Sequence, residues 1–103
     1  MTDLATLNRP YQAAYKLLSG SYYNGDISAT AERIARIVAA QQERHGMRYM
    51  QRLVQSYAAR QAIVVQLAGM AEAEGVRGGA VHALPLLDGA VAVAAKALWE
   101  EQP

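Results

Sequence analysis

The chain has 103 residues, of which 52% are apolar and 18% are charged. This length and balance fit one packed domain over residues 1–103 and exclude a disordered chain. Ten basic and nine acidic residues leave a net charge of +1, so the overall charge indicates no nucleic-acid, membrane or acidic partner. Cysteine is absent, which excludes disulfide scaffolds, thiolate metal sites and thiol nucleophiles.

Neither a secretory signal nor a membrane span is expected. Residues 1–10 lack the basic start and the apolar run that a secretory signal requires. The most apolar stretch, residues 84–99, is interrupted by Pro85, Asp88 and Lys96 and is shorter than the roughly 20 apolar residues that span a bilayer. We therefore expect a cytoplasmic protein with no membrane partner.

The sequence predicts helices throughout, starting with one over residues 8–19. Alanine is abundant, and no stretch alternates apolar and polar residues over the length of a strand. Asn8 can cap the first helix, and Pro10 is acceptable in a first turn because its missing N–H would be unpaired there. The glycines and asparagine within residues 19–26 favour a turn and end this helix.

A second helix is predicted over residues 28–45. Asp26 or Ser28 can cap its start, because a short oxygen-bearing side chain accepts a hydrogen bond from a free backbone N–H. Gly46 follows an arginine and a histidine, which is a typical helix ending. We favour a sharp corner at Gly46, and one long bent helix is the alternative.

The remaining residues predict a long helix over 47–74 and a last helix over 85–101. The last helix is apolar on two nearly opposite sides, with Leu84, Leu87, Val91, Ala95 and Leu98 on one side and Leu86, Ala90, Val93 and Ala97 on the other. A helix of this kind must be buried on both sides. We expect a self-associating bundle, in which Leu87, Val91, Leu98 and Trp99 form the protein interface. The alternative is a central helix wrapped by its own chain.

The residues that carry chemistry do not form a recognisable catalytic or metal-binding pattern. His45 and His82 are distant from each other and have no acidic residue at the spacing of a helical metal site. No Gly-x-Ser-x-Gly elbow is present to activate a serine nucleophile. We expect a protein that is not an enzyme and that holds no metal and no cofactor.

The small net charge conceals an uneven distribution along the chain. Residues 27–61 contain six arginines and two glutamates, a balance of +4, whereas residues 62–103 have a balance of −3. The arginines are Arg33, Arg36, Arg44, Arg48, Arg52 and Arg60. Arg44, Arg48 and Arg52 would form one row if the backbone stayed helical through Gly46, and arginine is suited to binding phosphates. The alternative is an ordinary solvated helix face.

Two hypotheses of function follow from these patterns. The first is an all-α bundle of about four helices that acts as a non-catalytic interaction protein, an adaptor, assembly factor or inhibitor, by self-association or by docking onto a larger complex. The second is a small subunit of a ribonucleoprotein that binds an RNA or DNA backbone through the six arginines. Tyr22 and Tyr23 could then stack on bases, or they could cover an edge of the core.

Overall fold

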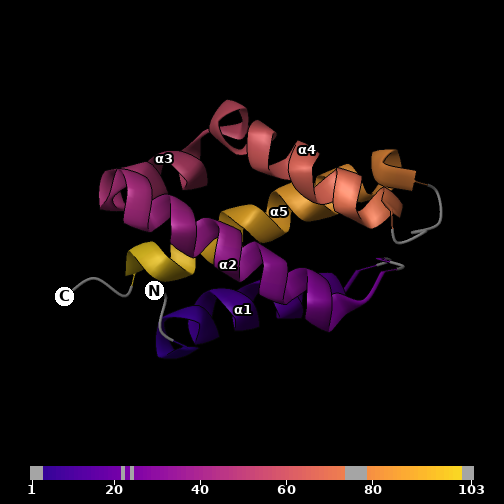
Figure 1. The fold of residues 1–103 in the computed structure, drawn as a ribbon, viewed down its shortest axis with the longest axis horizontal. Coiled ribbons are helices and arrows are strands. Elements are labelled where there is room, and N and C mark those ends of the chain that lie inside the picture. The colour runs from indigo at the N-terminus through magenta and orange to yellow at the C-terminus, as the bar shows by residue number, and fades with distance from the viewer. Residues whose placement is uncertain (1–3, 22, 24, 74–78, 101–103) are drawn as a thin grey trace.

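The computed structural model describes residues 4–21, 23, 25–73 and 79–100 (Figure 1). Within these ranges the chain forms five α-helices and no strand, so the all-α prediction is confirmed. The helices are α1 (Leu4–Ser19), α2 (Ile27–His45), α3 (Met47–Gln55), α4 (Tyr57–Ala73) and α5 (Gly79–Glu100). The predicted number of about four is one too small, because the expected helix over 47–74 is divided in two.

Local capping chemistry explains where α2 begins. The Asp26 carboxylate accepts a hydrogen bond from the Ala29 backbone N–H at 3.0 Å, which confirms one of the two predicted caps. By contrast, α1 begins at Leu4, one turn earlier than predicted. Pro10 therefore lies inside α1 rather than in its first turn, where its missing N–H removes one helical hydrogen bond.

Gly46 makes a sharp corner between α2 and α3, as predicted. Its backbone has φ +85° and ψ −179°, a combination that is essentially restricted to glycine. The Gly46 N–H donates to the Gln42 carbonyl at 2.8 Å and so closes the last turn of α2. The alternative of one long bent helix is excluded by this geometry.

A second break, at Ser56, was not predicted. Ser56 has an extended backbone, and its hydroxyl accepts a hydrogen bond from the Ala59 N–H at 3.2 Å, so it caps the start of α4. Its own N–H donates to the Arg52 carbonyl at 2.9 Å and closes the end of α3. A serine can either continue a helix or cap one, and the apolar spacing around residue 56 fits both.

Helix α5 is the centre of the fold and packs against each of the other four helices (Figure 1). It begins at Gly79, before the predicted start, and contains Pro85 within it. The side chains of Leu87, Val91 and Leu98 are buried by residues of the same chain. The expectation that a second copy must cover these side chains is therefore corrected. Helix α5 is instead a central helix wrapped by its own chain, which was the alternative interpretation of the sequence.

Small residues permit this close packing around α5. Ala90, Ala94 and Ala95 are fully buried. At Gly89, a Cβ atom would lie 3.3 Å from Cδ1 of Leu17, so α1 and α5 approach closely at this point. The core continues to the loop before α2, where the buried hydroxyls of Tyr23 and Thr30 are 3.0 Å apart.

Candidate functional site

Arg60, predicted to contact phosphate, instead has a structural role. Its Nε donates to Oδ1 of Asp88 at 2.7 Å and its Nη2 donates to Oδ2 of Asp88 at 3.2 Å. Its Nη1 donates to the carbonyls of Leu53 and Val54, at 2.7 and 3.0 Å, at the end of α3. Because all of these groups are already paired and only 11% of the arginine side chain is exposed, Arg60 does not belong to a phosphate-binding face.

The other five predicted arginines lie on α2 and α3 but do not form one continuous row. Arg36 is exposed and pairs with Glu32 one turn earlier, at 3.0 Å, and Arg33 also has an interaction partner. Arg44, Arg48 and Arg52 are all exposed. The corner at Gly46 separates Arg44 from the other two, which share one face of α3.

The four predicted interface residues are divided between core and surface. Leu87 and Val91 are fully buried and Leu98 is 2% exposed, so these three side chains pack inside the fold and present no surface to a partner. Trp99, near the end of α5, is 36% exposed. Tyr23 covers the core edge, whereas Tyr22 and the side chain of His82 lie outside the described residues.

The most unusual surface is an uncharged face on α4. The exposed residues between positions 57 and 71 are Tyr57, Ala58, Ala62, Val65, Gln66 and Gly69, and we call this set the α4 face. Tyr57 is 59% exposed and Val65 is 56% exposed. Arg60 is the one charged residue between positions 57 and 71, and it is paired with Asp88. The α4 face therefore carries no charge.

Helix α4 is apolar around most of its circumference, although the residues that the structure describes cover only one side of it. Its buried side consists of Ile63, Val64, Leu67, Ala68 and Ala71, which pack toward the core. On the opposite side, Ala58, Ala62, Val65 and Gly69 follow one another at spacings of four, three and four residues, so they form one stripe without a polar side chain. An apolar helix is normally buried on all sides, and α4 is not.

Gly69 is conspicuous on this stripe. A Cβ atom built at Gly69 would meet no atom within 4 Å among the residues that the structure describes, so their packing makes no use of the missing side chain. Glycine inside a helix is less favourable than alanine by about 1 kcal/mol. Gly69 therefore lowers the stability of α4, and no packing contact among the described residues compensates for this loss.

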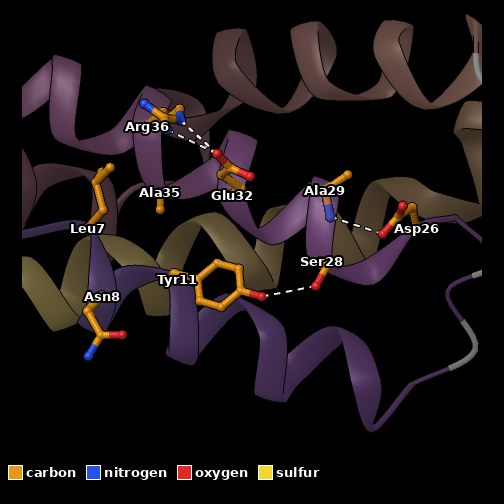
Figure 2. Close-up of a pocket in the computed structure, with 9 residues that line it drawn as sticks. All are labelled: Leu7, Asn8, Tyr11, Asp26, Ser28, Ala29, Glu32, Ala35 and Arg36. Carbon is orange, nitrogen blue, oxygen red and sulfur yellow. Dashed lines mark hydrogen bonds and ion pairs between the residues drawn. The ribbon is translucent and has the colours of Figure 1, made fainter. Parts of the chain in front are cut away.

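A groove of about 460 Å³ lies between α1 and α2 (Figure 2). The Tyr11 ring lies between the two helices, and its hydroxyl is 3.0 Å from the Ser28 hydroxyl. At one end Asp26 caps α2, and at the other Glu32 accepts two hydrogen bonds from Arg36 at 3.0 and 3.1 Å. These contacts hold α1 against α2 and stabilise α2, and they bring no nucleophile together with a base.

Two further classes of site have no candidate in the part of the chain that the structure describes. No group of three or more histidine or acidic side chains in these ranges could hold a metal ion. Among the described helices, none combines the length and apolar character that crossing a membrane requires.

Comparison with protein-family models, with curated proteins and with solved structures finds no match for this chain. Its function is therefore inferred from the residues and from their geometry alone.

The sequence alone did not single out the α4 face, because α5 is also apolar on two sides. One signal was present: residues 57–71 contain a single charge, and the exposed side of a helix normally carries several. Which of the two apolar helices is central depends on tertiary packing, and the spacing of apolar residues does not contain that information.

Proposed function

We propose that this protein is a non-catalytic interaction module that docks onto a protein surface through the α4 face. The observation that carries the proposal is the exposure of Tyr57 and Val65 on a helix face without charge. Solvent-facing helix surfaces are normally charged, whereas the centres of protein interfaces are depleted in charge and enriched in tyrosine. A partner that covers Tyr57 and Val65 would remove their apolar surface from water.

The borders of the α4 face support the same function. Glu72 is exposed one turn after Gly69, and the amide of Gln66 supplies a hydrogen-bond donor and an acceptor beside the apolar stripe. A central apolar region with polar groups around it is the usual organisation of a protein interface. The core of the module stays intact on binding, because the α4 face contributes no buried residue to it.

Photochemical cross-linking in the cells that produce the protein tests this proposal. Benzoylphenylalanine replaces Tyr57 in one variant and Tyr15 in the control, which is also an exposed tyrosine but lies on α1, a helix that does not contact α4 within the described residues. We expect a defined protein adduct from position 57, none from position 15, and loss of the adduct when Val65→Glu is added. Equal adducts at both positions, or none at position 57, would contradict the proposal.

A second function is supported by a different observation, the exposure of Arg44, Arg48 and Arg52 around the Gly46 corner. Three guanidinium groups can neutralise nucleic-acid phosphates without reading the sequence. The test is the binding of a fluorescent oligonucleotide of mixed sequence at several salt concentrations. Replacing the three arginines with glutamate should abolish a salt-dependent affinity. Arg36→Glu is the matched control. Because Arg36 is already paired with Glu32, its replacement should leave the affinity for the oligonucleotide unchanged.

A further inference from the structure

The corner between α2 and α3 presents three exposed arginines, Arg44, Arg48 and Arg52, which we call the corner arginines. We infer that they bind the phosphates of a single nucleic-acid strand and that one base of this strand stacks on the ring of His45. The inference rests on the second of the two functions proposed above, because it names the form of nucleic acid that the arginines bind.

The corner arginines differ from the other described arginines in having no partner. Arg36 and Arg60 form ion pairs with carboxylates, and Arg9 and Arg33 also have interaction partners. The corner arginines form no side-chain hydrogen bond or ion pair within the part of the chain that the structure describes. Their guanidinium groups therefore keep their hydrogen-bond donors for an anion from outside the described fold.

Carboxylates that could neutralise this charge are scarce near the corner. No aspartate or glutamate occurs between positions 44 and 71 of the sequence. Glu43, directly before the corner, already has an interaction partner. The described acidic residues of α5, Asp88 and Glu100, are both paired as well. The corner thus carries positive charge that the described residues do not compensate, and guanidinium groups are well suited to binding phosphates.

An aromatic pair lies at the same corner. The rings of His45 and Tyr49 have their centroids 4.7 Å apart, with an angle of 47° between their planes. Tyr49 packs partly against the core, whereas His45 is exposed. Tyr49 therefore supports an exposed ring that directly follows Arg44 in the sequence and precedes Arg48. Histidine is one of the aromatic side chains on which unstacked bases lie in nucleic-acid complexes.

The combination of charge and ring determines the form of the partner. The faces of the bases are covered in a duplex, whereas a single strand exposes them, and stacking on an aromatic side chain tolerates any base. An anion without a base, such as a phosphorylated side chain or a lipid headgroup, would contact the corner arginines and make no use of the His45 ring. A single strand uses both features, and we expect it to bind in preference to the others.

Fluorescence anisotropy with three probes separates contacts to the backbone from contacts to the bases. The probes are a short fluorescent oligothymidine, an abasic strand of the same length, and the duplex of the oligothymidine with its complement. All of them carry phosphates, but only the oligothymidine exposes the faces of its bases. Each probe is titrated with the intact chain at several salt concentrations.

Two variants and a matched control complete the design. His45→Ala removes the exposed ring, and a second variant replaces the corner arginines with glutamate. Tyr15→Ala is the control, because Tyr15 is also an exposed ring that contacts a second ring one turn away, Tyr11, at a centroid distance of 5.8 Å. Circular dichroism verifies that each variant keeps its helices.

We expect the native chain to bind the oligothymidine several-fold more tightly than the abasic strand or the duplex. His45→Ala should weaken binding of the oligothymidine roughly tenfold, as the loss of one base–aromatic contact does, and leave binding of the abasic strand unchanged. Tyr15→Ala should change neither. Three phosphate contacts with a single strand predict a slope of about −2 when the logarithm of the affinity is plotted against the logarithm of the salt concentration.

The outcomes distinguish this inference from the function on which it rests. Equal affinities for the oligothymidine and the abasic strand would overturn the base contact, and so would an oligothymidine affinity that His45→Ala leaves unchanged. Tighter binding of the duplex would overturn the single strand. In these cases a loss of binding in the glutamate variant leaves phosphate binding by the corner arginines supported. If the native chain binds none of the probes, the inference and the second proposed function both fail.

Discussion

Arg60 and Asp88, which are 28 residues apart in the sequence, form a two-pronged ion pair that joins α4 to α5. The same guanidinium group donates to two carbonyls at the end of α3, so that one side chain connects three helices. Both partners are mostly buried, at 11% and 20% exposed. Replacement of one partner therefore leaves a mostly buried charge without its counter-ion.

The first prediction concerns this pair. We expect Arg60→Leu to lower the free energy of unfolding by about 3 kcal/mol, because a buried carboxylate and two helix-end carbonyls lose their partner. Arg36→Leu, which breaks the exposed pair with Glu32, should change it by less than about 1 kcal/mol. Urea denaturation followed by circular dichroism measures both. An equal loss in the two variants would show that burial does not determine the contribution of the pair.

The second prediction concerns the corner between α2 and α3. Gly46→Ala should destabilise the fold by about 1–3 kcal/mol, because the backbone at this position adopts a conformation that a side chain strains. Space is not the cause, since no atom in the described part of the chain lies within 4 Å of the new methyl group. Thermal denaturation provides the measurement. An unchanged or raised melting temperature would indicate that α2 and α3 join without this corner.

The third prediction compares two glycines with opposite surroundings. A Cβ atom at Gly25 would lie 2.6 Å from the Tyr23 ring, which is held by its contact with Thr30, so we expect Gly25→Ala to lower stability. Gly69→Ala should raise stability by about 1 kcal/mol, because alanine is the better helix former and the position is open. Chemical denaturation of both variants checks the contrast. Two changes of the same sign would contradict it.

The fourth prediction separates core from surface. Val91→Asp places a charge in the centre of the fold, where the side chain is fully buried, and should prevent folding. The same substitution at the exposed Val65 should leave the circular dichroism spectrum and the melting temperature nearly unchanged. If Val91→Asp folded normally, α5 would not be the central helix.

Local chemistry was sufficient to predict some of these features. Asp26, as one of two possible caps, and Gly46, as the end of a helix, were identified from residue type and position, because helix capping and helix termination depend on a few neighbouring residues. The central position of α5 and the exposed position of α4 were not predictable in this way. Both helices are apolar on several sides, and only the packing of the whole chain determines which one is central.

The same limit applies to the candidate site residues. Arg60 was grouped with the other arginines because its partner, Asp88, is distant in the sequence and became a neighbour only through folding. Leu87, Val91 and Leu98 were correctly recognised as apolar residues that need a cover, but the cover is the chain itself. Which residues of α4 are exposed depends on how the five helices pack, so the sequence alone did not identify them.

The yield of the protein cross-link from position 57, measured with and without Val65→Glu, tests the central claim most directly, because that claim is docking through the α4 face. We expect a defined protein adduct when benzoylphenylalanine replaces Tyr57. We expect the adduct to be lost when Val65→Glu is added, since Val65 is exposed and its replacement leaves the core intact. No adduct from position 57, or an adduct that Val65→Glu leaves unchanged, would contradict docking through the α4 face.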